Sequence, residues 1–141
     1  MWKILTFSAG TAIVIILLAL LIKKLKEMQD IKSENVLVQC FGEPTYSNKF
    51  TLNQVREWLK TRSELISRGC KALVLKANRE TLKTIDKDVN IGSDVDNYIV
   101  IAIINQTSRS IEDSVLVKYE SLENSLEELL AKGNGTLVIG E

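Results

Sequence analysis

The chain has 141 residues, with 18 basic and 18 acidic side chains, two cysteines and no histidine. Without histidine it can hold neither a Ser–His–Asp triad nor a zinc site built from histidine and cysteine. Residues 36–141 carry thirteen bases and fifteen acids, and this slight acidic excess does not favour nucleic acid as a partner.

The N-terminal part is an uninterrupted apolar run from Ile4 to Ile22. As a helix, at about 1.5 Å per residue, it would extend roughly 28 Å, close to the ~30 Å hydrocarbon core of a bilayer. A cleaved signal peptide has a shorter apolar core, of about 7–15 residues, followed by small residues at the cleavage site. This run is longer and ends at lysines, so residues 4–22 are predicted as an uncleaved single-pass anchor after a flank of residues 1–3.

Lysines decide the predicted orientation of the anchor. Lys23, Lys24 and Lys26 follow the run, whereas Lys3 and the α-amino group precede it. Basic residues stay preferentially on the cytoplasmic side of a membrane, so we expect the rest of the chain in the cytoplasm. The charged segment 23–35 is predicted as a juxtamembrane helix or linker, and residues 36–141 as the soluble domain.

The first half of this domain predicts a strand–helix–strand unit. Val36–Phe41 is predicted as a strand. A helix follows from Thr51, because Thr51-x-x-Gln54 is a capping-box pattern and apolar residues recur after it at helical spacing. Gly69 is placed to end that helix, and Lys71–Ala77 is the second strand. Such a unit usually gives two parallel strands joined by a right-handed crossover.

The second half predicts three more strands and a second main helix. Tyr98–Ile104 is apolar on both faces, which is typical of a central strand, and Ser114–Glu120 alternates as its antiparallel neighbour. A helix with leucines on one face ends at Gly133, and Gly135–Ile139 is the closing strand. Asn78 is placed to cap a short extra helix after the second strand.

Together these elements predict an α+β fold. An N-terminal single transmembrane helix precedes a small domain with a mixed five-stranded sheet and two main helices, in the order β-α-β-β-β-α-β. If both helices cover one face of the sheet, alternate side chains of Tyr98–Ile104 leave a second apolar face. The 23–35 segment, a second copy, a partner or helices split over both faces must then cover it.

The sequence predicts no catalytic, metal or cofactor site. Cys40 and Cys70 have no histidine to act as a base, so they are interpreted as structural thiols. The segment from Asp86 to Asp96 places oxygen ligands at alternate positions, as a calcium loop does. However, Ile91 replaces the glycine and Asn97 the final glutamate of the EF-hand pattern. A solvated acidic loop is the favoured interpretation, and whether it binds a cation stays open.

One helix face is a candidate contact surface. Arg56, Lys60 and Arg68 lie on the first predicted helix, where they could meet an anionic membrane surface or an acidic partner. The alternative is an ordinary solvated face, since Glu57 and Glu64 dilute the positive charge.

These features favour a non-enzymatic protein-interaction or scaffolding module at the cytoplasmic membrane face. Its expected partners are the lipid bilayer and a protein partner or a second copy, with no small-molecule substrate evident. The alternative is an extracytoplasmic, membrane-tethered binding protein of the immunity or envelope-accessory type, in which Cys40 and Cys70 could form a disulfide. An enzyme using the paired carboxylates Asp94 and Asp96 is the least favoured hypothesis.

Overall fold

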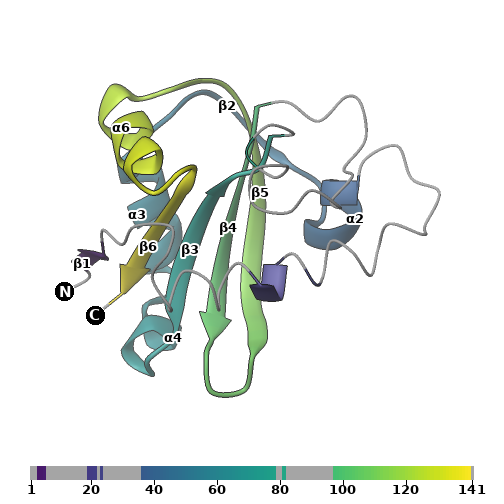
Figure 1. Ribbon diagram of the computed structural model, residues 1–141, viewed down its shortest axis with the longest axis vertical. Coiled ribbons are helices and arrows are strands. Elements are labelled where there is room, and N and C mark those ends of the chain that lie inside the picture. Colours follow the sequence, from purple (N-terminus) through teal and green to yellow (C-terminus); the bar gives the residue numbers. More distant parts are fainter. Residues whose placement is uncertain are drawn as a thin grey trace.

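The computed structural model describes residues 3–5, 19–21, 23, 36–78, 81 and 97–140. In this part of the chain six strands form one sheet in the order β1-β6-β3-β4-β5-β2, with helices packed on it (Figure 1). The strands are β1 (Lys3–Leu5), β2 (Thr45–Phe50), β3 (Lys71–Lys76), β4 (Tyr98–Asn105), β5 (Ser110–Leu122) and β6 (Thr136–Gly140). The helices are α2 (Val36–Phe41), α3 (Leu52–Lys60), α4 (Ser63–Ser67) and α6 (Asn124–Lys132).

The sheet is mixed, as predicted. The pairs β1–β6, β6–β3, β3–β4 and β4–β5 are antiparallel, and the pair formed by β5 and β2 is parallel. Five strands, β2 to β6, come from the predicted domain, so the α+β class with a mixed sheet is confirmed. The pairing inside the first unit differs from the prediction. Strands β2 and β3 share a direction but are separated by β5 and β4.

The prediction of a strand at Val36–Phe41 is wrong, because these residues form helix α2. A short apolar run fits either structure by periodicity alone. Here the Gly42 N–H donates to the Val38 carbonyl at 2.8 Å, and Gly42 adopts a φ of +89°, a conformation that suits glycine at a helix end. The first strand is instead β2, which lies in the segment that we expected to be a connection.

The predicted first helix begins as expected but is divided in two. The Thr51 hydroxyl accepts a hydrogen bond from Gln54 N at 3.2 Å, and the Gln54 side chain accepts one from Thr51 N at 3.0 Å. This is the predicted capping box. The helix breaks at Thr61–Arg62 into α3 and α4, and Gly69 follows with a φ of +96°, which agrees with its predicted role as a stop.

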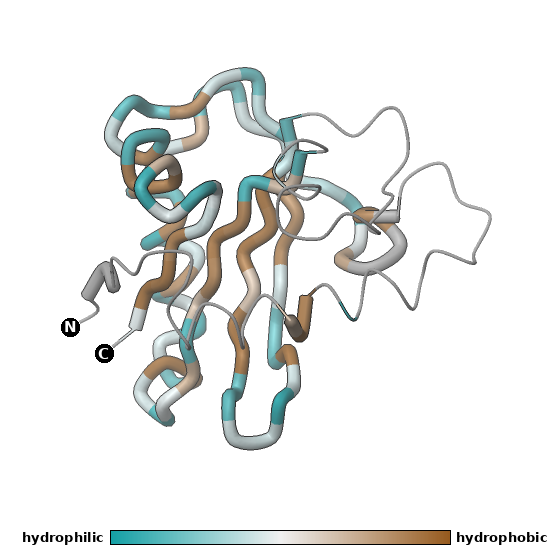
Figure 2. The backbone as a smooth tube through the Cα atoms, in the orientation of Figure 1, coloured by the Kyte–Doolittle hydropathy of each residue, from teal (hydrophilic) through white to brown (hydrophobic). Residues whose placement is uncertain are grey.

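The main helices cover one face of the sheet. Figure 1 shows α3, α4 and α6 on the same side, and Figure 2 shows the hydrophobic stretches of the strands beneath them. We call the cluster between these helices and the sheet the helix-side core. It includes Val55, Leu59 and Ile66 from the helices and Ile99 and Ile101 from the central strand.

The opposite face is apolar too, and it is buried. Its side chains alternate with those of the helix-side core, and they are Leu73, Leu75, Val100, Ala102, Ile104, Leu116 and Val138. Leu21 and Leu37 are also fully buried without belonging to the helix-side core. Helix α2, which holds Leu37, packs against β5 on the side away from α3, α4 and α6 (Figure 1). The second apolar face expected from the sequence is therefore present, and the chain itself contributes to covering it.

The predicted transmembrane helix falls mostly outside the described residues. Among the residues that are described, we find no helix with the length and apolar character needed to cross a bilayer. Ile4 and Leu5 belong to strand β1, not to the start of a helix. Lys23 is helical and exposed, whereas Ile22, Lys24 and Lys26 lie outside the described part, as does the acidic loop 86–96.

Of the expected short helix after β3, the structure describes Asn78 and Thr81. The Asn78 side-chain oxygen accepts a hydrogen bond from Thr81 N at 2.7 Å, which is the contact of an N-cap. Thr81 itself is helical, and the residues after it lie outside the described part.

Candidate interaction surface

Strand β2 is the outermost strand at one end of the sheet. Its parallel register places Tyr46 beside Lys118, and the antiparallel register of β4 and β5 places Lys118 beside Tyr98. Directly paired residues point to the same face, so these three side chains form a row across three strands. Tyr46 is 74% exposed and Tyr98 is buried. The Lys118 ammonium lies over the Tyr98 ring, 5.6 Å from its centroid.

A depression of about 470 Å³ lies beside Tyr46 and Lys118. It is lined by Tyr46, Ser47, Asn48, Lys118, Tyr119 and Glu120, and we call it the β2–β5 surface. Exposed aromatic side chains are enriched at the centres of protein interfaces. An outermost strand also offers backbone N–H and C=O groups to an added strand. This arrangement is chemically suited to an extended peptide segment.

Glu123 connects the end of β2 to the first turns of α3 and α6 through hydrogen bonds. Its backbone N–H donates to the Phe50 carbonyl at 2.9 Å, and its carboxylate accepts from Leu52 N at 3.1 Å and from Ser125 Oγ at 2.9 Å. One of the unpaired N–H groups at the start of α3 is thereby satisfied from the β5–α6 connection. The bond from Leu52 N, followed by the one from Ser125, lowers the pKa of the Glu123 carboxyl below its ordinary value of 4.5.

Because its pKa is lower in the folded state, Glu123 adds stability above pH 4.5 that is lost as the pH falls through the folded pKa. In Glu123→Gln we expect the acid-induced loss of stability below pH 4.5 to be smaller than in the wild type, since the titrating group is gone. Urea unfolding at a series of pH values measures this. The same change at the exposed Glu128 on α6 is the control, and equal pH profiles for wild type and Glu123→Gln would refute the linkage.

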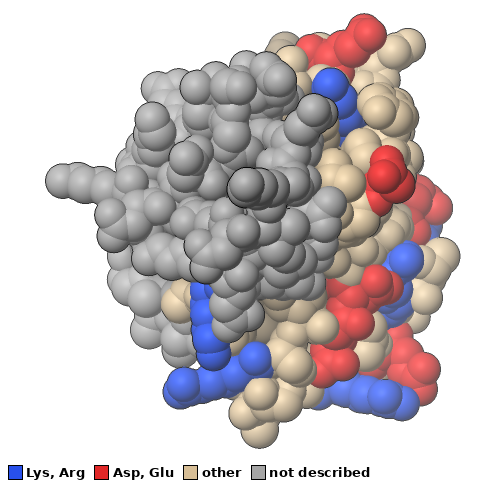
Figure 3. All heavy atoms as spheres, turned by 90° about the vertical axis from the view of Figure 1, so that its right-hand side faces the viewer, with Lys and Arg blue, Asp and Glu red and all other residues tan. Residues whose placement is uncertain are grey.

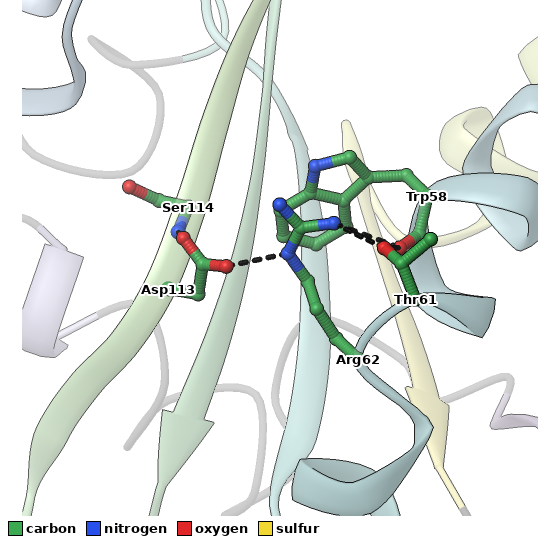
Figure 4. A network of polar contacts seen from close by, with 5 residues as sticks. All are labelled: Trp58, Thr61, Arg62, Asp113 and Ser114. Carbon is green, nitrogen blue, oxygen red and sulfur yellow. Dashed lines mark hydrogen bonds and ion pairs between the residues drawn. The ribbon is translucent and has the colours of Figure 1, made fainter.

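A polar network joins the α3–α4 turn to β5 (Figure 4). Arg62 Nε donates to Asp113 Oδ2 at 2.5 Å, and its Nη1 donates to the Trp58 carbonyl at 3.1 Å and to Thr61 Oγ1 at 2.5 Å. The guanidinium carbon lies 3.9 Å from the centroid of the Trp58 ring. The other Asp113 oxygen accepts from Ser114 N at 2.8 Å. These contacts join residues of the domain to one another, as in a network that stabilises the fold.

The predicted basic residues lie on the surface, but not as one free positive patch. Lys60 pairs with Glu57 at 2.9 Å and Arg68 pairs with Glu64 at 2.8 Å, all four side chains being more than half exposed. Arg56 is exposed. Exposed pairs of this kind hold together weakly, by about 0–1 kcal/mol. The acids that dilute the face in the sequence are thus the partners of its bases in the structure.

Basic side chains also gather at one end of the sheet. Figure 3 shows lysine and arginine side chains along the lower end of the molecule, with acidic side chains along the right-hand border. The lower end holds the β4–β5 turn (Figure 1). Arg109 belongs to that turn, and Lys71 pairs with Ile104 beside it. This turn-side end is a second basic region, distinct from the α3 residues singled out in the sequence.

Cys70 is a buried free thiol, as expected. It is 3% exposed and belongs to the helix-side core. Burial, helped by the nearby charge of Glu112, raises the pKa of the Cys70 thiol. Cys70 follows α4, while Cys40 belongs to α2, far away across the sheet (Figure 1). The fold therefore keeps these two cysteines apart.

In a Cys40→Ser variant, we expect Cys70 to react with an aromatic disulfide reagent much more slowly in the native protein than in urea. Burial denies the reagent access, and the raised pKa depletes the reactive thiolate. The release of the coloured thiol measures the rate. Equal rates in both states would show that the pocket around Cys70 is open.

Within the described residues no group of three or more acidic, cysteine or histidine side chains is placed to hold a metal ion.

No protein-family model, curated protein or solved structure matches this chain. The sequence does not predict the β2–β5 surface, because residues 42–50 have the composition of a connection between a strand and a helix. The signal was weak: two aromatic residues, Tyr46 and Phe50, in an otherwise polar stretch.

Proposed function

We propose that this protein is a single-pass, membrane-anchored, non-enzymatic interaction module whose α+β domain lies at the cytoplasmic membrane face. The observation that carries the proposal is the apolar run Ile4–Ile22, followed at once by Lys23, Lys24 and Lys26. The free Cys70 thiol is consistent with a reducing compartment.

The β2–β5 surface supports a role in binding a protein segment. Its outermost strand is six residues long and predominantly exposed, and Tyr46 is the large hydrophobic side chain that the described part of the domain exposes. We propose that an extended peptide adds to β2 and packs on Tyr46, with Lys118 and Glu120 at the edges of the contact.

A topology measurement tests the anchor and its orientation. We expect a reporter fused after Glu141 to be active when it requires the cytoplasm and inactive when it requires the exterior. The opposite result would refute the proposed orientation and favour the extracytoplasmic binding protein. Loss of the fusion from the membrane fraction would refute the anchor itself.

A second experiment tests the surface. A photo-crosslinking residue replacing Tyr46 is expected to give a specific adduct in membranes, and Lys118→Glu in the same chain is expected to weaken it. The same crosslinker at Arg56, which is exposed on α3, is the matched control. Adducts of equal strength at both positions would count against the β2–β5 surface.

The basic regions are proposed as contacts with lipid headgroups, each well-placed base contributing about 1 kcal/mol near an anionic surface. Arg56→Glu with Lys60→Glu tests the α3 face, and Lys71→Glu with Arg109→Glu tests the turn-side end. The preference of the full chain for anionic over neutral vesicles should fall in the pair that faces the membrane. An unchanged preference in both pairs would remove lipid contact from the proposal.

A further inference from the structure

The first residues of the apolar run lie on the domain in this structure. Strand β1 pairs antiparallel with β6, the register joining Lys3 to Gly140 and continuing through the next two residues of each strand. β1 forms the edge of the sheet opposite to β2. It therefore covers the outer edge of β6, whose inner edge pairs with β3.

Near the end of the same run, Leu21 is buried. Leu21 is 0% exposed, whereas Lys23, two residues later, is exposed. The start of the run that we propose as the anchor is therefore held by the domain here, and Leu21 near its end is shielded from solvent.

These positions exclude the membrane-spanning one. A helix over residues 4–22 would place Ile4 and Ile22 on opposite sides of the bilayer, roughly 28 Å apart. Strand β6 lies in the part of the chain that follows the lysines, so it would lie on the far side from Ile4. One segment cannot pair with β6 and span the bilayer at the same time.

We infer that the N-terminal segment exchanges between a domain-bound position, with β1 on β6, and a membrane-inserted position, and that insertion uncovers the outer edge of β6. The inference rests on the proposed anchor. In the inserted form the backbone N–H and C=O groups on the outer edge of β6 become available to another strand. In the domain-bound position β1 thus occupies the outer edge of β6, and insertion of the segment into the membrane leaves that edge unpaired.

A disulfide lock tests the exchange. Opposite residues of an antiparallel pair have Cα atoms about 4.5–5.5 Å apart, which suits a disulfide. We choose Lys3→Cys with Gly140→Cys, because the atoms nearest to an added Cβ at Gly140 belong to the flexible Lys71 side chain, with Cδ at 2.6 Å. The background is Cys40→Ser with Cys70→Ala. The control is Lys3→Cys with Thr45→Cys, since Thr45 lies on β2 at the opposite edge of the sheet.

The full chain is made by cell-free synthesis without lipid, oxidised, and mixed with phospholipid vesicles for flotation. We expect the Lys3→Cys, Gly140→Cys chain to form an intramolecular disulfide, to lose flotation when oxidised, and to float like the wild type once reduced. The control is expected to form no such disulfide and to float under both conditions.

Each other outcome has a distinct meaning. If the disulfide does not form, the domain-bound position is refuted. If the oxidised chain floats as well as the reduced chain, the two positions are compatible and the exchange is refuted while the anchor stands. If the wild type does not float, the anchor is refuted and the exchange with it, although a formed disulfide would still support the pairing of β1 with β6.

Discussion

Leu73→Ala is expected to lower the free energy of unfolding by about 2–5 kcal/mol, as large a loss as for a leucine in the helix-side core. Leu73 is fully buried on the second face of the sheet, between Ala102 on β4 and Val138 on β6. The substitution removes buried apolar surface and leaves a cavity among neighbours that are fixed by the sheet. Urea unfolding followed by tryptophan fluorescence, with an unchanged slope, measures the loss.

The matched comparison is Leu59→Ala, the same change at a fully buried position on the helix side. Tyr46→Ala, at an exposed position, is expected to stay within about 0.5 kcal/mol of the wild type. A loss below about 1 kcal/mol for Leu73→Ala, beside a full loss for Leu59→Ala, would mean that the second face is open to solvent. The conclusion that the second face of the sheet is covered would then be wrong.

Arg62→Ala has the second large expected effect, a loss of about 2 kcal/mol. The guanidinium joins Asp113 to the Trp58 carbonyl and stacks on the Trp58 ring. Hydrogen bonds to charged groups contribute about 1.5–3 kcal/mol and a partly exposed cation–π contact about 0.5–1 kcal/mol. Solvent screening reduces the sum, because the side chains of Arg62 and Asp113 are 28% and 40% exposed.

Two variants separate geometry from charge. Arg62→Lys keeps the charge but loses the planar fork, so most of the loss is expected to remain. Arg68→Ala removes an exposed ion pair between Arg68, which follows α4, and Glu64 within α4. The expected change in the free energy of unfolding is near zero. If Arg62→Lys restored wild-type stability, charge alone would explain the interaction and the stacked geometry would be irrelevant.

Much of the domain could be predicted because its signals are local. The capping box at Thr51, the stop at Gly69 and the all-apolar central strand each depend on residues close in sequence. Four predicted strands and both main helical regions lie where periodicity placed them. The error at Val36–Phe41 arose where a six-residue apolar run fits a helix or a strand equally well.

The candidate interaction surface could not be predicted in this way. The row of Tyr46, Lys118 and Tyr98 exists because β2 pairs with β5 rather than with β3. No local pattern encodes that choice of neighbour, since it depends on how the whole sheet buries its two faces. The basic residues Arg56, Lys60 and Arg68 lie on the surface, but only the structure shows that Lys60 pairs with Glu57 and Arg68 with Glu64.

The sequence by itself determined the α+β class, the helix caps and stops, the alternation that makes both faces of the sheet apolar, and a nineteen-residue apolar run ending at lysines. These follow from side-chain chemistry at fixed spacing along the chain. The tertiary structure alone decided the strand order, the parallel pairing of β2 with β5, the separation of Cys70 from α2 and the pairing of β1 with β6. These features depend on which distant segments of the chain contact each other. The free energy that favours such tertiary contacts comes from apolar surface buried across the whole sheet rather than from any one stretch of residues.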